Sequence, residues 1–165
     1  MKYIRLLLGS IIVLFLFITI ISLFIPSHIK LSKAINVKAG KEKVMMQISE
    51  PQNWKKWYPG LDSADIIYGG EMIKGWRFNK NARIELAGVT NDEVKAVFTG
   101  GKTNPVQNGW KLMPYPGNDS VAVQWYMDFH LRWYPWEKFA SLLLEKSYGS
   151  KMEQGLTDLK HLVEN

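Results

Sequence analysis

The longest run of apolar positions lies near the N-terminus of the chain. Residues 6–25 (LLLGSIIVLFLFITIISLFI) contain no charged side chain, and a helix of that length spans about 30 Å, the thickness of a bilayer core. The run is apolar on all sides, unlike a helix that lies on a membrane surface. It exceeds the ~7–15 apolar residues of a signal peptide and ends in Phe24-Ile25-Pro26, without a small-residue cleavage site. We therefore predict a transmembrane anchor at residues 1–27, followed by one domain at residues 28–165.

Basic residues flank both ends of this anchor. Lys2 and Arg5 flank its start, and five lysines follow it at positions 30, 33, 38, 41 and 43. Counting these charges would keep the domain in the cytoplasm, but long domains translocate largely regardless of charge. The sequence therefore predicts a single-pass membrane protein and leaves the side of the soluble domain open.

After the anchor, apolar and polar residues alternate with a period of two in several short runs. Ile29, Leu31, Ile35 and Val37 share one face of the first run, which is typical of a half-buried strand. A helical pattern follows at residues 40–48, Pro51 interrupts it, and residues 52–58 form a second short helix or turn. Further strands are predicted at residues 64–68, 72–78, 82–89, 93–99, 106–113 and 121–131, separated by turn signals that include Gly69-Gly70, Gly100-Gly101 and Pro116-Gly117-Asn118-Asp119.

The C-terminal part of the chain has a helical period. Pro135 ends the last strand, and apolar residues recur at positions 136, 139, 143, 152, 156, 159 and 163. Closely spaced strands with tight turns favour an antiparallel meander over βαβ units. The predicted fold class is α+β: a curved antiparallel sheet of about seven strands, two short helices and one long C-terminal helix, preceded by the transmembrane helix. A curved sheet closed by one helix can enclose a cavity.

Composition and charge narrow the classes of function. The chain has no cysteine, which excludes disulfides, thiolate metal sites and a cysteine nucleophile. Its net charge is +6, but without residues 1–30 it carries 18 basic and 15 acidic residues, a formal charge of +3. Such a domain has no strong preference for phosphate, so we predict no nucleic-acid partner.

Polar residues form no catalytic or metal-binding motif along the sequence. None of His28, His130 and His161 has a second ligand at a spacing such as H-x-x-x-H. Asp62 and Asp65 form a carboxylate pair in a loop, where solvated side chains are usual. We predict no catalytic residue, no metal and no cofactor.

The segment around Lys55-Lys56 imitates a basic and aromatic nucleic-acid patch. Single-strand binders need several stacking aromatics along a positive groove, and this segment has one lysine pair between Trp54 and Trp57. We expect solvated lysines and buried tryptophans. Contact of the lysines with anionic lipid headgroups is the alternative.

Aromatic residues, 13% of the chain, are its most informative feature. In the last strand Trp125, Met127 and Phe129 share the face that must meet the helix, whereas Gln124 and Asp128 lie on the other face. Large rings fill a core as readily as they line a cavity. We predict that Trp125 lines a cavity, so that its truncation should cost less than the ~3–5 kcal/mol of a core tryptophan and should weaken ligand binding more than folding. The candidate ligand-binding residues are Trp57, Tyr58, Trp76, Phe78, Phe98, Trp110, Trp125, Met127 and Phe129.

Several segments also resemble a known family. The residues INVKAGKEKV at 35–44, EPQNWKKWYP at 50–59 and GLTDLK at 155–160, with the VQW strand at 123–125, are similar to the START/polyketide-cyclase (SRPBCC) superfamily. The resemblance covers residues 31–164 and implies the helix-grip fold. It also implies an apolar ligand, because members are mostly carriers or sensors of such molecules, with some aromatase/cyclases. The family has no shared catalytic signature to transfer.

Three functions are therefore open. The first is a membrane-tethered, non-enzymatic domain that binds a hydrophobic small molecule (lipid, polyketide or isoprenoid-like) between sheet and long helix. The second is a cyclase-type enzyme, for which Arg83, Glu85 and Tyr58 are the polar groups to consider, provided that they face the interior. The third is a closed interaction module without a cavity of about 300 Å³. No protein partner is indicated.

Overall fold

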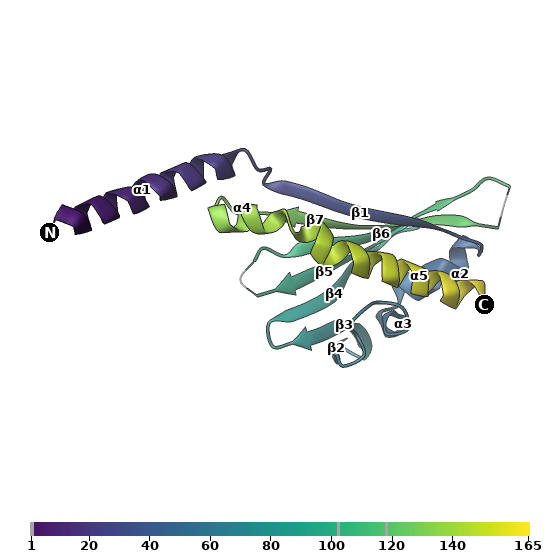
Figure 1. Cartoon of the computed structure of the whole chain (residues 1–165). Coiled ribbons are helices and arrows are strands. Elements are labelled where there is room, and N and C mark those ends of the chain that lie inside the picture. The colour runs from purple at the N-terminus through teal and green to yellow at the C-terminus, as the bar shows by residue number, and fades with distance from the viewer. Residues whose placement is uncertain (1, 102, 118) are drawn as a thin grey trace.

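The computed structural model describes residues 2–101, 103–117 and 119–165. Asn118, in the predicted turn at 116–119, lies outside the described residues. Helix α1 (Lys2–Leu23) extends away from the rest of the molecule (Figure 1). Tyr3–Leu23 has a mean hydropathy of 2.9 and is, among the described residues, the one helix long and apolar enough to cross a membrane.

The domain contains seven strands: β1 (His28–Val37), β2 (Asp65–Gly69), β3 (Met72–Asn79), β4 (Ala82–Val89), β5 (Glu93–Gly100), β6 (Val106–Pro114) and β7 (Val121–His130). They form one antiparallel sheet in the order β1-β7-β6-β5-β4-β3-β2. Strands β2 to β7 follow one another as an antiparallel meander. Strand β1, the first in the chain, lies at the edge beside β7 and pairs with it along its whole length. The predicted strands are thus present.

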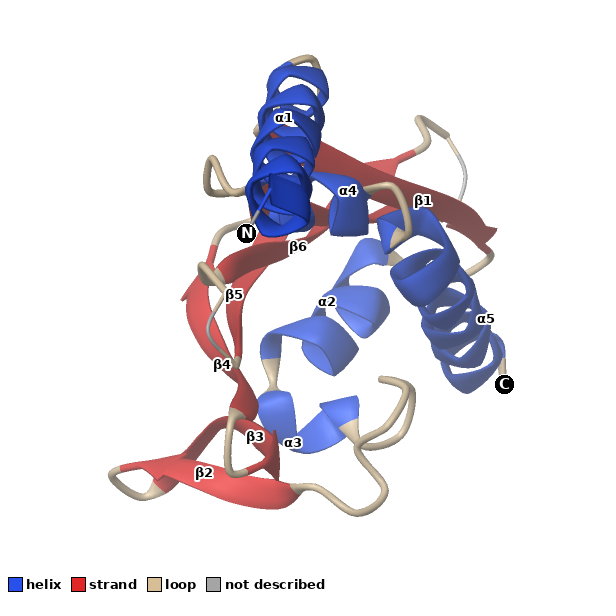
Figure 2. Ribbon diagram, turned by 60° about the vertical axis from the view of Figure 1, so that its left-hand side comes forward, coloured by secondary structure: helices blue, strands red, loops and turns tan. Residues whose placement is uncertain are grey.

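The sheet curves around the helices (Figure 2). Strand β7 shows why: Val121, Val123, Trp125, Met127 and Phe129 are all buried on its inner face, as the period of two requires. The same parity buries Ile84 on β4 and Leu112 on β6. The hydrophobic core therefore lies in the concave side of the sheet.

Helices α2 (Lys41–Ser49) and α3 (Pro51–Trp54) lie inside this curve (Figure 2). Pro51 begins α3, where a proline costs no hydrogen bond. Two indole N–H groups join these helices, since Trp54 donates to the carbonyl of Ile48 and Trp57 to that of Gln47. A third joins α3 to the sheet, since Trp76 of β3 donates to the carbonyl of Pro51. Trp54 and Trp57 are buried, while Lys55 and Lys56 are exposed, as expected.

The C-terminal helical segment differs from the prediction in one respect. It consists of α4 (Pro135–Ser141), a turn, the π-helical η1 (Glu145–Gly149) and α5 (Ser150–Glu164). Helix α5 buries Met152, Leu156, Leu159 and Val163 and packs on β1. In contrast, the earlier apolar positions Trp136, Phe139 and Leu143 are exposed. The helical period was correct, but the apolar side chains of α4 are exposed, and this helix lies beside α1 (Figures 1 and 2). The α+β class, the seven-stranded sheet and the long C-terminal helix are confirmed.

Candidate functional site

Two cavities separate the concave face of the sheet from the C-terminal helices. The first, which we call the central cavity, has a volume of about 340 Å³. Strand residues form one wall and helical residues the other. Its lining residues are Tyr58, Pro59, Phe78, Asn79, Ala82, Phe98, Trp125, Met127, Ser147, Tyr148, Lys151 and Met152.

The second, which we call the anchor-side cavity, has about 360 Å³ and lies beneath α4. It is lined by Phe98, Gly100, Thr103, Asn104, Val106, Phe129, His130, Leu131, Glu137, Ala140, Ser141, Leu144 and Tyr148. Because Phe98 and Tyr148 line both cavities, the two spaces adjoin across this pair of rings. The interior is therefore hollow on the scale of small-molecule sites, which begins at about 300 Å³.

The structure divides the sequence-predicted site residues into two groups. Tyr58, Phe78, Phe98, Trp125 and Met127 line the central cavity, and Phe129 lines the anchor-side cavity. Trp57, Trp76 and Trp110 instead belong to the buried core and are not among the lining residues of either cavity. Sequence reasoning missed the helical wall. Tyr148 and Met152 are one helical turn apart, a spacing that could have indicated it.

A cluster of rings forms the rigid floor of the central cavity. The Trp125 ring centroid is 5.1 Å from that of Tyr58 and 5.5 Å from that of Trp110, and Trp57 meets Trp110 edge to face at 5.6 Å. The Trp125 indole N–H also donates to the side-chain oxygen of Asn108 over 3.0 Å. Rings fixed this way present a pre-formed apolar surface.

The central cavity contains few polar groups. Burial raises the pKa of the Tyr58 hydroxyl, and the nearby Tyr148 phenol adds to the increase, so Tyr58 stays protonated at neutral pH. Lys151, Ser147 and Asn79 complete the polar lining, and no carboxylate or histidine is among the described residues that line this cavity. The site can orient a ligand by hydrogen bonds, but it lacks a general base with a perturbed pKa.

Glu137 is the carboxylate of the anchor-side cavity. Its Oε1 accepts a hydrogen bond of 2.7 Å from Nε of Arg132, and its Oε2 accepts one from the Arg132 backbone N–H. The hydrogen bonds from Arg132 lower the pKa of Glu137 despite partial burial. An ionised carboxylate held in this way is a structural group rather than a proton donor.

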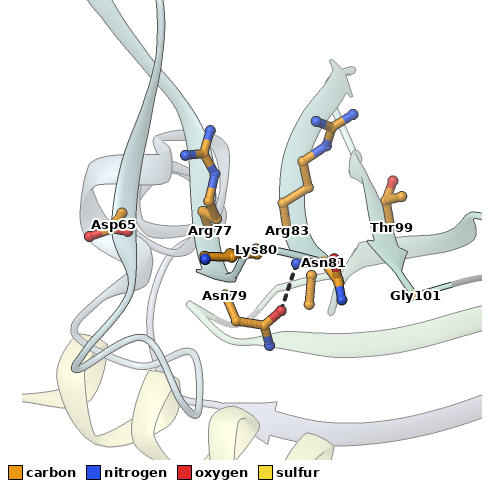
Figure 3. A pocket seen from close by; sticks show the side chains of 9 residues that line it. Asp65, Arg77, Asn79, Lys80, Asn81, Arg83, Thr99 and Gly101 are labelled. Carbon is orange, nitrogen blue, oxygen red and sulfur yellow. Dashed lines mark hydrogen bonds between the residues drawn. The ribbon is translucent and has the colours of Figure 1, made fainter.

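A larger groove, of about 780 Å³, lies at the β3–β4 turn (Figure 3). The side chains of Arg77, Arg83 and Thr99 point away from the C-terminal helix there. Arg83 pairs with Glu85 over 2.9 Å, and the buried Ile84 between them faces the core. Arg83 and Glu85 therefore lie on the outer face of the sheet. The cyclase hypothesis required its polar residues to face the interior, and Arg83 and Glu85 do not.

Strand pairing brings together the one group of described residues able to hold a metal ion. His28 and His130 are direct partners in the β1–β7 register, and their rings stack with centroids 4.5 Å apart. Nε2 of His28 is 2.5 Å from Oδ1 of Asp128, and the ligand atoms of all three lie within 4.8 Å of one another. Asp128 and His130 share one face of β7, but the spacing argument could not add His28, because only the register of β1 with β7 brings it to them.

The comparisons agree with this architecture. The family model described as "Polyketide cyclase / dehydrase and lipid transport" matches residues 28–164. The chain belongs to this family. The START/polyketide-cyclase resemblance inferred from sequence is thereby confirmed, and the domain is a ligand-binding domain of the START/polyketide-cyclase type. No curated protein matches the chain in sequence.

Solved structures of other proteins share the fold of this polyketide cyclase/lipid transport domain. A protein from Nitrosospira multiformis has a TM-score of 0.65 at 16% identity, covering 82% of this chain and 96% of its own. A START superfamily protein from Mycobacterium smegmatis has a TM-score of 0.62 at 17% identity, covering 82% and 97%. Norcoclaurine synthase from Thalictrum flavum, in complex with dopamine and hydroxybenzaldehyde, has a TM-score of 0.59 at 17% identity, covering 80% and 86%. Identities this low establish the fold alone.

Proposed function

We propose that the domain binds a hydrophobic or amphipathic small molecule non-covalently in the two adjoining cavities, and that α1 tethers it to a membrane. The observation that carries the proposal is the hollow interior, whose two spaces of about 340 and 360 Å³ meet at Phe98 and Tyr148. A lipid-like molecule suits both the aromatic walls and the tether, because such molecules partition into bilayers. The closed-module alternative requires a solid interior.

A non-enzymatic role fits the lining of the central cavity, whereas His130 lines only the anchor-side cavity. The polar groups in the central cavity are phenols, one amide, one hydroxyl and one ammonium, which can fix the orientation of a ligand. Catalysis by general acid and base would need groups whose pKa lies near the working pH. Burial instead raises the pKa of Tyr58 further above neutral.

The second candidate is a cyclase-type enzyme that folds a reactive chain by shape. Lys151, Tyr58 and Tyr148 favour it, because all three line the same cavity and could donate to the oxygens of a polycarbonyl chain. Norcoclaurine synthase, an enzyme by its name, has the same fold. Lys151→Met separates the two candidates: binding of an apolar ligand should survive it, and turnover of a polycarbonyl substrate should not.

The test uses a chain that begins at Ile25. Solved relatives that consist almost wholly of this domain, 96 and 97% of their chains, indicate that the fold needs no anchor. Native mass spectrometry of this chain, purified without detergent, should detect a bound apolar molecule that organic solvent extracts. Ala82→Phe places a ring in the central cavity, since Ala82 lines it, and should abolish the adduct.

Ala122→Phe is the matched control. Ala122 lies in β7 between the inward-facing Val121 and Val123, so its side chain is on the outer face. A domain that is empty in repeated preparations, and that also fails to bind a broad panel of lipids and polyketides, would contradict the proposal.

A further inference from the structure

Exposed apolar residues gather on one short segment of the domain. Trp133, Trp136, Leu142 and Leu143 are 66, 61, 66 and 60% exposed, and Phe139 is also at the surface. These residues belong to α4 and the turns on either side of it. Single exposed apolar residues are ordinary, but five within eleven consecutive positions form a patch that marks an interaction surface.

Helix α4 is fastened to the end of α1. The buried Lys138 ammonium donates to the carbonyl of Ile25 over 2.7 Å and to the hydroxyl of Ser27 over 2.5 Å. Helix α4 packs against α1, and Figures 1 and 2 both place the two side by side. Ser22 is buried and Ile18 and Thr19 are half-buried, in a helix that is otherwise largely exposed.

This contact fixes the depth of α4 relative to the anchor. Ile18 and Ser22 lie one turn apart on the same face of α1, about 6 Å along its axis at ~1.5 Å per residue, and Ile25 follows the end of this helix at Leu23. If the apolar run at 6–25 spans a bilayer, α4 lies alongside its last two turns. The patch is therefore level with the membrane interface, where tryptophan and tyrosine are enriched.

The polar groups of α4 are already satisfied and do not oppose this placement. Glu137 is hydrogen-bonded to Arg132, and Lys138 is bound to the anchor end. Tyr134 and Trp136 stack with centroids 4.7 Å apart, which presents a rigid aromatic surface. A charge that is paired or bound to a carbonyl costs less to bring near lipid than a free one.

The opposite side of α4 faces the interior. Glu137, Ala140 and Ser141 of α4 line the anchor-side cavity, so α4 is a wall with the patch on one side and the cavity on the other. We propose that the outer face of α4 lies in the lipid bilayer interface, and that apolar molecules dissolved in the bilayer enter and leave the anchor-side cavity past α4. This inference rests on the proposed tether and ligand binding, and it adds the exchange route.

The absence of cysteine permits a direct test on the full chain in phosphatidylcholine vesicles. Single cysteines are introduced by Leu142→Cys, Leu14→Cys and Met72→Cys and labelled with a nitrobenzoxadiazole fluorophore. Leu142 reports on the patch, Leu14 on the anchor, and Met72, 80% exposed at the start of β3, on a distant surface. Nitroxide lipids should quench the probes at 142 and 14, whereas iodide in the water should quench only the probe at 72.

The three probes separate the possible failures. A lipid-protected probe at 14 with an iodide-quenched probe at 142 would overturn the docking of α4 and leave the tether intact. Iodide quenching at both positions would overturn the tether and the docking together. Far-UV circular dichroism of each labelled chain checks that it is folded.

The exchange route has its own test. Transfer of anthroyloxy-labelled stearate from vesicles is followed by energy transfer from the tryptophans. The double variant Leu142→Ser with Leu143→Ser should slow transfer at least several-fold and leave the equilibrium affinity unchanged, with Met72→Ser as the matched control. An unchanged rate would exclude entry past α4. Loss of equilibrium binding in the wild-type chain would instead count against the proposed function.

Discussion

Gly155 of α5 lies directly against the ring of Trp125. A β-carbon at Gly155 would lie 2.7 Å from Cζ3 of Trp125 and 2.8 Å from Cδ of Pro59, closer than van der Waals contact allows. The helix therefore approaches the ring cluster as closely as its backbone permits. This contact fixes the distance between sheet and helix beside the central cavity.

Gly155→Ala should destabilise the domain. In an exposed helix the change would gain up to about 1 kcal/mol, but here the new methyl group must displace Trp125 or Pro59, at a cost of about 1–3 kcal/mol. Urea denaturation of the chain that begins at Ile25 measures the difference. Gly149→Ala is the control, because its β-carbon would chiefly meet the Glu145 carboxylate at 2.8 Å, the end of a flexible, exposed side chain that pairs with Lys33. Shifting this side chain should cost little, so we expect the variant to be close to neutral. Equal effects of the two variants would contradict the argument.

Trp125→Ala should cost much of the domain's stability. Trp125 is 2% exposed, its ring packs against those of Tyr58 and Trp110, and its N–H is bonded to the buried Asn108. We expect a loss of about 3–5 kcal/mol. Trp125→Phe keeps most of the ring volume but leaves Asn108 without this donor, and should cost about 1–3 kcal/mol.

This expectation differs from the one based on sequence. The alternation of β7 predicts that Trp125 faces the helix, but it contains no information on the hydrogen bond to Asn108 or on the ring cluster. Both the core role and the cavity role therefore apply to this residue. Denaturant midpoints and ligand affinity, measured together on Trp125→Phe, separate the two contributions.

The sequence predicted the sheet well because strand alternation is a local signal. The expected strand at 72–78 is observed at Met72–Asn79, and that at 121–131 at Val121–His130. The break in the C-terminal helix was not predicted, because the apolar period continues across it. The packing partner nevertheless changes, since α4 packs against α1 and α5 packs against the sheet. The cavity lining was predicted only in part, since alternation gives the inward face of Trp110 but not whether its ring meets space or another ring.

Lys33 joins β1 to the C-terminal helices at two points. Its ammonium is 2.6 Å from the Glu145 carboxylate in η1 and 2.8 Å from that of Glu153 in α5, and these hydrogen bonds raise its pKa. Lys33→Met keeps the length of the side chain and removes both ion pairs. We expect only a small loss of stability, since the carboxylates are exposed and solvent screens both ion pairs.

The salt dependence of this effect distinguishes it from lost packing. Charges at the surface are screened at about 1 M salt, where the Debye length is about 3 Å. The difference in urea midpoint between wild type and Lys33→Met should therefore shrink at high salt. A difference that is independent of salt would mean that the methylene chain of Lys33, rather than its charge, stabilises the contact between β1 and the C-terminal helices.

Tyr126 should make the domain less stable at alkaline pH. Its ring covers Gly109 on β6, where a β-carbon would lie 2.2 Å from Cζ of the ring, and its hydroxyl donates to Oε1 of Glu93 over 2.7 Å. Burial and this hydrogen bond raise the pKa of Tyr126 from 10.0 to about 12. Folding therefore favours the protonated phenol. The associated stability is fully present below pH 10 and is lost as the pH rises through about 12.

Tyr126→Phe should remove this part of the pH profile. At neutral pH the variant should be less stable by about 1 kcal/mol, because it lacks the hydrogen bond to Glu93. Between pH 10 and 12 the wild type should lose stability more steeply than the variant, so the two curves of unfolding free energy converge. Some slope remains in the variant, because burial also raises the pKa of Tyr58 and Tyr148. Glu93→Gln, which removes the charged acceptor, should give an intermediate slope; parallel curves for wild type and Tyr126→Phe would mean that Tyr126 contributes by packing alone.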